Sequence, residues 1–246
     1  MTNILLLDIE TAPNLGYFWR IWKENIGTNQ IVNNGHVLSW AAKWLGNRDM
    51  MFGARWKDGE RPMLARVHHL LNEADIVVHY NGKSFDIPTL NKEFILHDFP
   101  PPAPYKQVDL LLVVRDTFAF VSNKLDYVSK TLGMGEKVRH PGFELWVKTM
   151  NGDAVAQRQM ERYNRRDVVL LERLYLRLRP WIKNHPNVNY EATACPNCGS
   201  KNFQRRGTAI ATLLRYQRYQ CQNCATWFRG TKAINVGRKE RYTGIV

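Results

Sequence analysis

The chain has 246 residues, of which 44% are hydrophobic and 23% are charged, as is typical of a globular protein and not of a disordered chain. No apolar run approaches the roughly 18 residues of a membrane-spanning helix, and residues 1–8 resemble a short strand more than a signal peptide. We therefore expect a soluble, cytoplasmic protein with one α/β domain, a small appended domain and no membrane partner.

The net charge of +13 is concentrated near the C-terminus. Residues 187–246 carry ten basic and two acidic side chains, whereas residues 1–186 carry 25 and 20. A concentrated positive charge attracts polyanions, of which nucleic acid is the most common inside cells, although an anionic membrane surface would satisfy the same charge.

The hydrophobic pattern predicts an α/β domain, a linker and a small C-terminal module. In chain order we expect strands over 3–9, 36–56 and 76–80, helices over 61–73, 84–97, 125–132 and 154–181, a short segment over 108–114 and a proline-rich loop over 100–104. The expected boundaries are an α/β domain over 1–182, a linker over 183–193, the small module over 194–232 and a basic tail over 233–246.

Two acidic side chains end the first predicted strand. Asp8 and Glu10 are two residues apart, so their carboxylates project from the same face of the strand. Neighbouring carboxylates repel each other unless a cation lies between them, and Mg²⁺ and Mn²⁺ prefer carboxylate oxygens. Taken alone, an Asp-x-Glu at a strand end is also typical of a solvated turn or a helix cap.

A second motif, Asn81-Gly82-Lys83-Ser84-Phe85-Asp86, follows the strand predicted over 76–80 and begins a helix. This position places Asp86 at the same edge of the sheet as Asp8, where the sites of α/β proteins form. The alternative interpretation is a turn followed by a helix cap, which needs no ligand.

The third motif lies on the long helix predicted over 154–181. Tyr163 and Asp167 share one helix face with three leucines, because all five follow the helical period. A carboxylate on an apolar face needs a partner, which is either a metal ion or a neighbouring arginine.

In this order and spacing, the three motifs resemble those of the DEDD superfamily of 3′–5′ exonucleases, in particular the tyrosine-bearing branch related to the proofreading domains of family B DNA polymerases. The resemblance covers residues 3–180, and residues 124–133 look like the helix that precedes the third motif there. It implies a ribonuclease H-like fold, a mixed sheet flanked by helices. The first motif departs from many proofreading enzymes, because it continues Thr11-Ala12-Pro13 where they have Thr-Gly.

The resemblance also implies the roles of five residues. Asp8, Glu10, Asp86 and Asp167 correspond to the four metal-binding acids, and Tyr163 corresponds to the residue that orients the attacking water. Two Mg²⁺ or Mn²⁺ ions would then support phosphodiester hydrolysis, one by activating water and the other by stabilising the leaving oxygen. The implied substrate is a nucleic acid with a 3′ end, with DNA and single strands favoured.

Other residues are candidates for holding the substrate. Asn81 and Lys83 belong to the second motif, where Lys83 either meets a phosphate or is simply solvated. An aromatic cluster closely follows the first motif and either stacks on terminal bases or forms part of the core. Its members are Tyr17, Phe18, Trp19 and Trp22.

Four cysteines form two C-x-x-C pairs, Cys195 with Cys198 and Cys221 with Cys224, and 22 residues lie between the two pairs. This spacing is close to that of a structural Cys₄ zinc site, and such pairs in a reducing compartment indicate metal rather than disulfides. We expect one structural zinc ion, with a strand over 214–220 leading into the second pair. The module resembles the zinc ribbons of transposases and transcription-related proteins.

Arginines alternate with aromatic residues through the expected zinc ribbon, a composition typical of a nucleic-acid surface. The alternatives are a small aromatic core with solvated arginines, or a docking surface for a protein partner. The residues are Arg205, Arg206, Arg215, Arg218 and Arg229, interleaved with Phe203, Tyr216, Tyr219, Trp227 and Phe228.

Two other functions stay open at this point. A ribonuclease or structure-selective nuclease would use the same acids, because discrimination between DNA and RNA depends on contacts near the 2′ position. A catalytically inert nucleic-acid-binding or recruitment protein would lack one of the acids, and none is missing.

Overall fold

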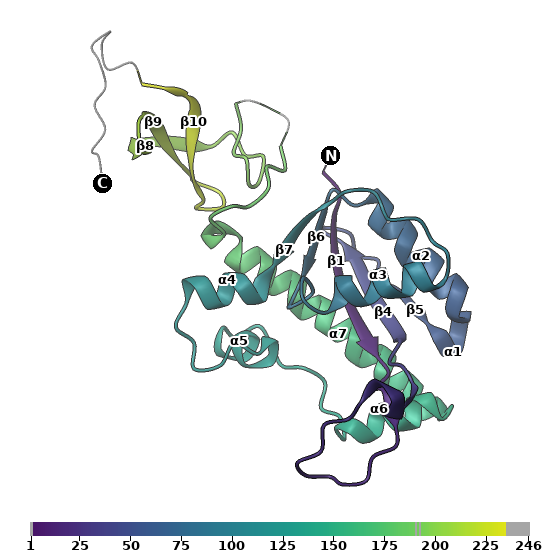
Figure 1. The fold of residues 1–246 in the computed structure, drawn as a ribbon. Helices are drawn as coiled ribbons and strands as arrows, with labels where there is room; N and C mark the ends of the chain where they lie inside the picture. The colour runs from purple at the N-terminus through teal and green to yellow at the C-terminus, as the bar shows by residue number, and fades with distance from the viewer. Residues whose placement is uncertain (1, 190, 192, 235–246) are drawn as a thin grey trace. The chain divides into compact units, whose positions relative to one another are not determined.

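The computed structural model describes residues 2–189, 191 and 193–234, and the chain divides into two compact units (Figure 1). One unit comprises residues 3–176, and the other comprises residues 1–2 and 177–246. The predicted basic tail lies almost wholly outside the described residues, since only residues 233 and 234 of it are described. Among the described helices, none is long and apolar enough to cross a membrane.

A mixed five-stranded sheet forms the centre of residues 3–176, with the strand order β5-β4-β1-β6-β7. β1 is antiparallel to β4 and parallel to β6, and β4 and β6 continue the sheet outward to β5 and β7. β1 is central because its aliphatic run is buried on both faces of the sheet. The strands are β1 (Ile4–Thr11), β4 (Val37–Trp44), β5 (Met51–Ala54), β6 (Ile76–His79) and β7 (Lys106–Asp109).

Helices cover both faces of this sheet, which confirms the predicted α/β fold (Figure 1). α2 (Glu60–Glu73) and α3 (Asp86–Leu96) bury apolar side chains against the face that carries Leu5, Leu7 and Ile9. The alternation of β1 directs Asp8 to the opposite face, where α7 (Ala154–Leu178) lies and Lys43 pairs with Glu172. The strand that builds the core thus also presents its acids to α7.

Shorter elements complete residues 3–176. They are β2 (Leu15–Gly16), the 3-10 helix η1 (Thr28–Gln30), β3 (Ile31–Asn33), α1 (Arg55–Asp58), α4 (Leu110–Thr117), α5 (Leu125–Thr131) and α6 (Phe143–Met150). The hydrophobic pattern predicted α5 but not α6. The segment predicted over 108–114 spans the end of β7 and most of α4.

The C-terminal unit contains an antiparallel three-stranded sheet in the order β10-β9-β8. Its strands are β8 (Phe203–Ile210), β9 (Arg215–Cys221) and β10 (Trp227–Ala233), and the short 3-10 helix η2 (Arg179–Trp181) precedes them. β9 confirms the strand predicted over 214–220. Phe203, Tyr219 and Phe228 pack together with ring centroids 5.3–5.4 Å apart, so these three aromatics form a small core.

Candidate active site and metal centre

The carboxylates of Asp8, Glu10 and Asp167 converge between β1 and α7. One oxygen from each lies within 4.8 Å of the others. Strand alternation places Asp8 and Glu10 on one face of β1, and the helical period places Asp167 on the buried stripe of α7 with Leu171 and Leu174. Asp167 is only 2% exposed, so its charge cannot be balanced by bulk water.

Asn164 fixes the position of Asp8. Its side-chain Nδ2 donates to Asp8 Oδ2 at 2.7 Å and to the Asp8 carbonyl at 3.2 Å. The Ser39 hydroxyl donates in turn to Asn164 Oδ1 at 3.2 Å. Both Ser39 and Asn164 are fully buried, so β4 and α7 together hold the orientation of the Asp8 carboxylate.

Asp86 lies beside this group without being part of it. It is the first residue of α3, and its Oδ1 accepts a hydrogen bond from the Ile9 amide at 3.1 Å. Ile9 separates Asp8 from Glu10 along β1, so Asp86 braces the strand between the two acids. Its side chain is 4% exposed, and its negative charge contributes to raising the pKa of Asp8.

Burial raises the pKa of every one of these acids, and repulsion from the neighbouring site carboxylates adds to this effect at Asp8 and Glu10. For Asp8 and Glu10 the largest cause is burial, and the next is the charge of Asp167. Together they raise the pKa of Asp8 well above its usual value and the pKa of Glu10 to about 8. Burial raises the pKa of Asp86 to about 7, and burial also raises that of Asp167 against the lowering effect of Lys137. A cation at the group would relieve this repulsion and restore the ionised carboxylates.

Lys137 is a cation at this site that the sequence pattern did not reveal. It lies in the segment between α5 and α6, and its ammonium pairs with Asp167 Oδ2 and donates to the Tyr163 hydroxyl at 3.0 Å. A lysine from a distant segment therefore takes the place of the neighbouring arginine that was the alternative to a metal ion. Asp167 raises the pKa of Lys137 against the effect of its burial, so the ammonium stays charged.

Tyr163 is held in place by an aromatic cage. Its ring meets His140 edge to face at 4.9 Å and Trp146 at 6.0 Å, and the side chain is 7% exposed. Burial raises its pKa to about 12, so the hydroxyl is protonated at neutral pH. The Trp146 side chain also lowers the pKa of Glu10, so α6 influences the acids.

An open cleft of about 920 Å³ reaches Asp8, one of the three converging acids. Asp8 and Tyr163 line it together with basic and polar side chains, among them Arg115, Lys124 and Lys137. Asp8 thus faces a cleft whose walls carry these three basic side chains as well as the acidic Asp126, and the basic side chains suit a phosphodiester backbone.

The residues at this cleft fit a divalent metal ion. Asp167 Oδ1 is buried and accepts no hydrogen bond from any described residue, so one ligand oxygen is free. All three carboxylates offer hard oxygen ligands of the kind that Mg²⁺ and Mn²⁺ prefer. Such an ion would polarise the scissile phosphate and lower the pKa of a bound water.

The loop of the second motif is ordered around Asp109. Asp109 Oδ1 accepts from the Asn81 amide at 2.9 Å, and its Oδ2 accepts from the Lys83 amide at 3.1 Å. Asn81 has a positive φ of 68° and lines the cleft, whereas the side chain of Lys83 is exposed. Gly82 is required here, because a Cβ at this position would lie 2.4 Å from Cγ of the buried His79.

The aromatic cluster after the first motif is exposed, so the alternative that it belongs to the core is wrong. Tyr17 is 80% exposed, Trp19 94% and Trp22 82%, and Phe18 is 54% exposed. These side chains follow β1 directly, within the segment that contains β2 and β3. They are therefore available to contact a ligand.

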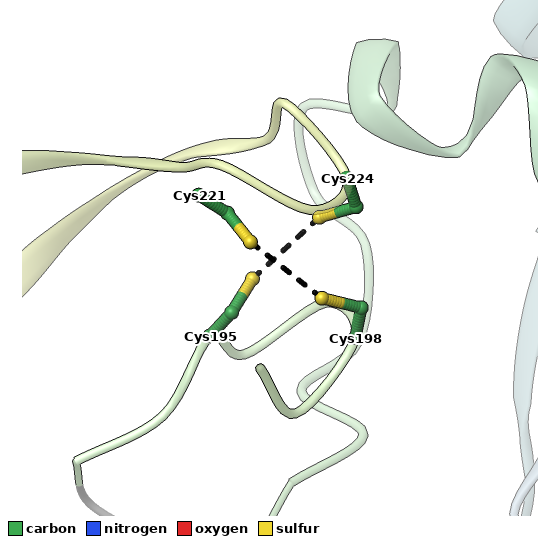
Figure 2. A group of neighbouring side chains, drawn as sticks. All are labelled: Cys195, Cys198, Cys221 and Cys224. Carbon is green, nitrogen blue, oxygen red and sulfur yellow. Dashed lines mark hydrogen bonds between the residues drawn. The ribbon is translucent and has the colours of Figure 1, made fainter. Parts of the chain in front are cut away.

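The four cysteine sulfurs form a compact group in the C-terminal unit. Figure 2 shows their side chains pointing toward one another, with Sγ–Sγ distances of 3.7 Å for Cys195–Cys224 and 3.6 Å for Cys198–Cys221. These distances are far longer than the roughly 2.05 Å of a disulfide, and they approach the roughly 3.8 Å edge of a tetrahedral zinc–thiolate site. The group therefore fits a zinc ribbon.

The predicted arginines of the ribbon are exposed, with two of them stacked on aromatic rings. Arg218 lies 5.0 Å from the Trp227 ring centroid, and Arg229 lies 3.9 Å from that of Tyr216. Three aromatic rings of the ribbon thus form its small core, and two others stack with arginines. The exposed arginines are Arg205, Arg206, Arg215, Arg218 and Arg229.

Comparison with known proteins agrees with this architecture. In the solved structures 124 chains match, among them the family B DNA polymerase from the hyperthermophilic archaeon Pyrobaculum calidifontis, with 20% sequence identity and a TM-score of 0.55. That match covers 73% of this chain but only 25% of the polymerase, so the chain spans about a quarter of the polymerase's length. No curated protein matches.

A family model identifies the superfamily. The model of the RNase_H superfamily matches residues 50–179, which include Asp86, Tyr163 and Asp167, whereas Asp8 and Glu10 precede the match. The match covers more than half of the sequence and most of the unit that holds the acids. The chain therefore belongs to the RNase_H superfamily.

Proposed function

We propose that this protein is a metal-dependent 3′–5′ exonuclease that hydrolyses phosphodiester bonds of nucleic acid, with DNA as the favoured substrate. The observation that carries the proposal is the convergence of Asp8, Glu10 and Asp167, with Asp8 lining a cleft that also carries basic side chains. The superfamily supports a nuclease, and the order of the sequence motifs supports the 3′–5′ exonuclease type.

Each residue of the proposed site has a separate task. Asp8, Glu10 and Asp167 would hold Mg²⁺ or Mn²⁺, two ions in all, and Asp86 would either complete the ligand set or brace β1 through Ile9. Asn164 orients Asp8, and Lys137 fixes the Tyr163 hydroxyl beside Asp167. Tyr163 then positions the attacking water by a hydrogen bond and remains neutral throughout, because its pKa is about 12.

The exposed aromatic cluster supports a single-stranded substrate. Tyr17, Trp19 and Trp22 begin a few residues after Glu10, and exposed rings can stack on unpaired bases without regard to sequence. Asn81 would contact the strand from the cleft wall. We therefore propose that the end of an unpaired strand enters the cleft.

The proposed function is tested by digesting one oligonucleotide as single-stranded DNA, duplex DNA and RNA, labelled at its 5′ end, with Mg²⁺ or Mn²⁺. A ladder of stepwise shortened products that disappears when the 3′ end is chemically blocked is expected for single-stranded DNA. Cleavage of RNA alone would favour a ribonuclease, and cleavage only at a duplex junction would favour a structure-selective nuclease. Binding without cleavage would favour an inert recruitment protein.

Replacing Tyr163 by phenylalanine is expected to lower turnover about 10- to 1,000-fold, the effect of losing one positioned hydrogen bond. The affinity for Mn²⁺ is expected to stay unchanged, because the proposed role of the hydroxyl is to orient water and not to bind the metal ion. Single-turnover rates and calorimetric Mn²⁺ titration measure the two quantities. Tyr127→Phe is the matched control, since Tyr127 lies on α5 outside the cleft lining. Turnover equal to wild type would assign Tyr163 to packing alone.

We further propose that Cys195, Cys198, Cys221 and Cys224 hold one structural zinc ion and that the ribbon binds the substrate strand. A Cys₄ site closes the coordination shell, so the ribbon binds and does not cut. Its exposed arginines and their stacked rings support contacts to phosphates and bases. Docking of a protein partner is the competing role.

The double variant Arg205→Gln/Arg215→Gln of the full chain is expected to weaken binding of single-stranded DNA. If each arginine neutralises one phosphate, the slope of log affinity against log salt becomes shallower by about 1 to 1.5. Fluorescence anisotropy at several salt concentrations measures the slope. The control is Arg48→Gln/Lys57→Gln, which removes two exposed charges from residues 3–176 outside the cleft. An unchanged slope in the first variant would favour protein docking by the ribbon.

A further inference from the structure

A second group of metal-ligating side chains lies away from the proposed catalytic acids, where α2 begins and α3 ends. Glu60 is the first residue of α2, Glu93 lies in the last turns of α3, and His97 directly follows α3. One ligand atom from each of the three lies within 4.8 Å of the others. None of the three has a role in the site described above.

The three inner atoms have the spacing of ligands around one centre. His97 Nε2 lies 3.5 Å from Glu60 Oε1 and 3.9 Å from Glu93 Oε2. Both distances exceed the roughly 2.7–3.2 Å of an N–H···O hydrogen bond, and one Nε2–H could serve only one carboxylate well. They are close to the roughly 3.4 Å edge of a tetrahedral site with metal–ligand bonds near 2.1 Å.

Glu93 is the most unusual member of the group. Its side chain is 4% exposed, and its buried Oε1 accepts no hydrogen bond from any described residue. The Lys92 ammonium pairs with Oε1 at 2.9 Å and also donates a hydrogen bond to the Gly35 carbonyl. Lys92 thus balances this buried carboxylate from the side of Oε1, whereas Oε2 faces His97.

The outer oxygens of both carboxylates face cations, while the inner oxygens face His97. Arg55 Nη2 lies 3.1 Å from Glu60 Oε2, and Lys92 Nζ lies 2.9 Å from Glu93 Oε1. These partners orient the carboxylates from outside and leave the centre of the group to a further ion. The side chains of Glu60 and His97 are 32% and 26% exposed, so water can reach the centre and complete a coordination shell.

We propose that Glu60, Glu93 and His97 form a second metal site, which binds a borderline divalent transition-metal ion of the Zn²⁺ class. An imidazole nitrogen beside two carboxylates suits Zn²⁺ better than Mg²⁺, which prefers oxygen ligands alone. The ion joins the start of α2 to the end of α3. Because α3 begins at Asp86, the site stabilises the helix that braces the catalytic strand.

The test compares zinc binding by the full-length wild type and His97→Gln at equal free Zn²⁺, held in the micromolar range by a metal buffer. Bound zinc is expected to fall by one equivalent per chain in His97→Gln, because the ribbon and the catalytic acids are unchanged. Zinc is also expected to raise the wild-type melting temperature by roughly 5 °C or more relative to the variant. Glu93→Gln is expected to behave in the same way, and it replaces His97→Gln in the test if His97→Gln folds poorly.

His69→Gln is the matched control. His69 lies on α2 with its Nε2 3.4 Å from Glu73 Oε1, so it forms the same kind of His–Glu pair, but on the surface with side chains 72% and 48% exposed. It is expected to bind as much zinc as the wild type. Equal zinc content and equal melting shifts in wild type, His97→Gln and Glu93→Gln would overturn the proposal and leave the group as an ion-pair network.

Discussion

Replacing Asp167 by asparagine is expected to lower metal-dependent hydrolysis about 1,000-fold or more while the protein stays folded. The substitution keeps the volume of the buried side chain but removes the charge that faces Asp8 and Glu10, and it replaces one of the two carboxylate oxygens by an NH₂ group that cannot bind a metal ion. Without that charge, Lys137 also loses its anionic partner. Single-turnover rates on single-stranded DNA, with circular dichroism to verify folding, measure the effect.

Asp116→Asn is the control for this experiment, because Asp116 is an exposed carboxylate of α4 outside the cleft lining. It is expected to cleave at the wild-type rate. Asp8→Asn and Glu10→Asn are expected to resemble Asp167→Asn, since all three carboxylates form one group. Turnover within tenfold of wild type in any two of these three variants, in preparations free of contaminating nuclease, would reject the proposed site.

The metal-free protein is expected to lose stability as the pH rises from about 6.5 to about 8.5. Burial raises the pKa of Glu10 from 4.5 to about 8 and that of Asp86 from 3.8 to about 7. The native state therefore keeps protons that the unfolded chain has released, so the free energy of unfolding falls until the native groups ionise. The loss for Glu10 over this range is on the order of 2 kcal/mol.

Saturating Mn²⁺ is expected to abolish most of this pH dependence, because the bound ion keeps the native carboxylates ionised throughout this pH range. Urea unfolding at several pH values, with and without Mn²⁺, measures the difference. Glu10→Gln should flatten the metal-free curve, because glutamine takes up no proton. A metal-free stability that stays constant or rises between pH 6.5 and 8.5 would contradict the repulsion described for the acids.

Local sequence patterns were sufficient to place the main acids. Alternation along β1 puts Asp8 and Glu10 on one face, and the helical period of α7 puts Tyr163 and Asp167 on its buried stripe. The spacing of the cysteine pairs likewise predicted the group that converges in the ribbon. These patterns depend on the geometry of one helix or strand, or of two C-x-x-C pairs near each other in sequence. They can therefore be recognised from the spacing of the residues along the chain.

Contacts between distant segments were decided only by the tertiary structure. Lys137 reaches Asp167 from a segment without helical or strand periodicity, and Glu60 meets Glu93 and His97 across two helices. The position of Asp86 against the Ile9 amide likewise depends on how α3 packs on β1. A hydrophobic period specifies which face of an element is buried but not which distant side chain will lie against it, because that depends on the packing of the whole core.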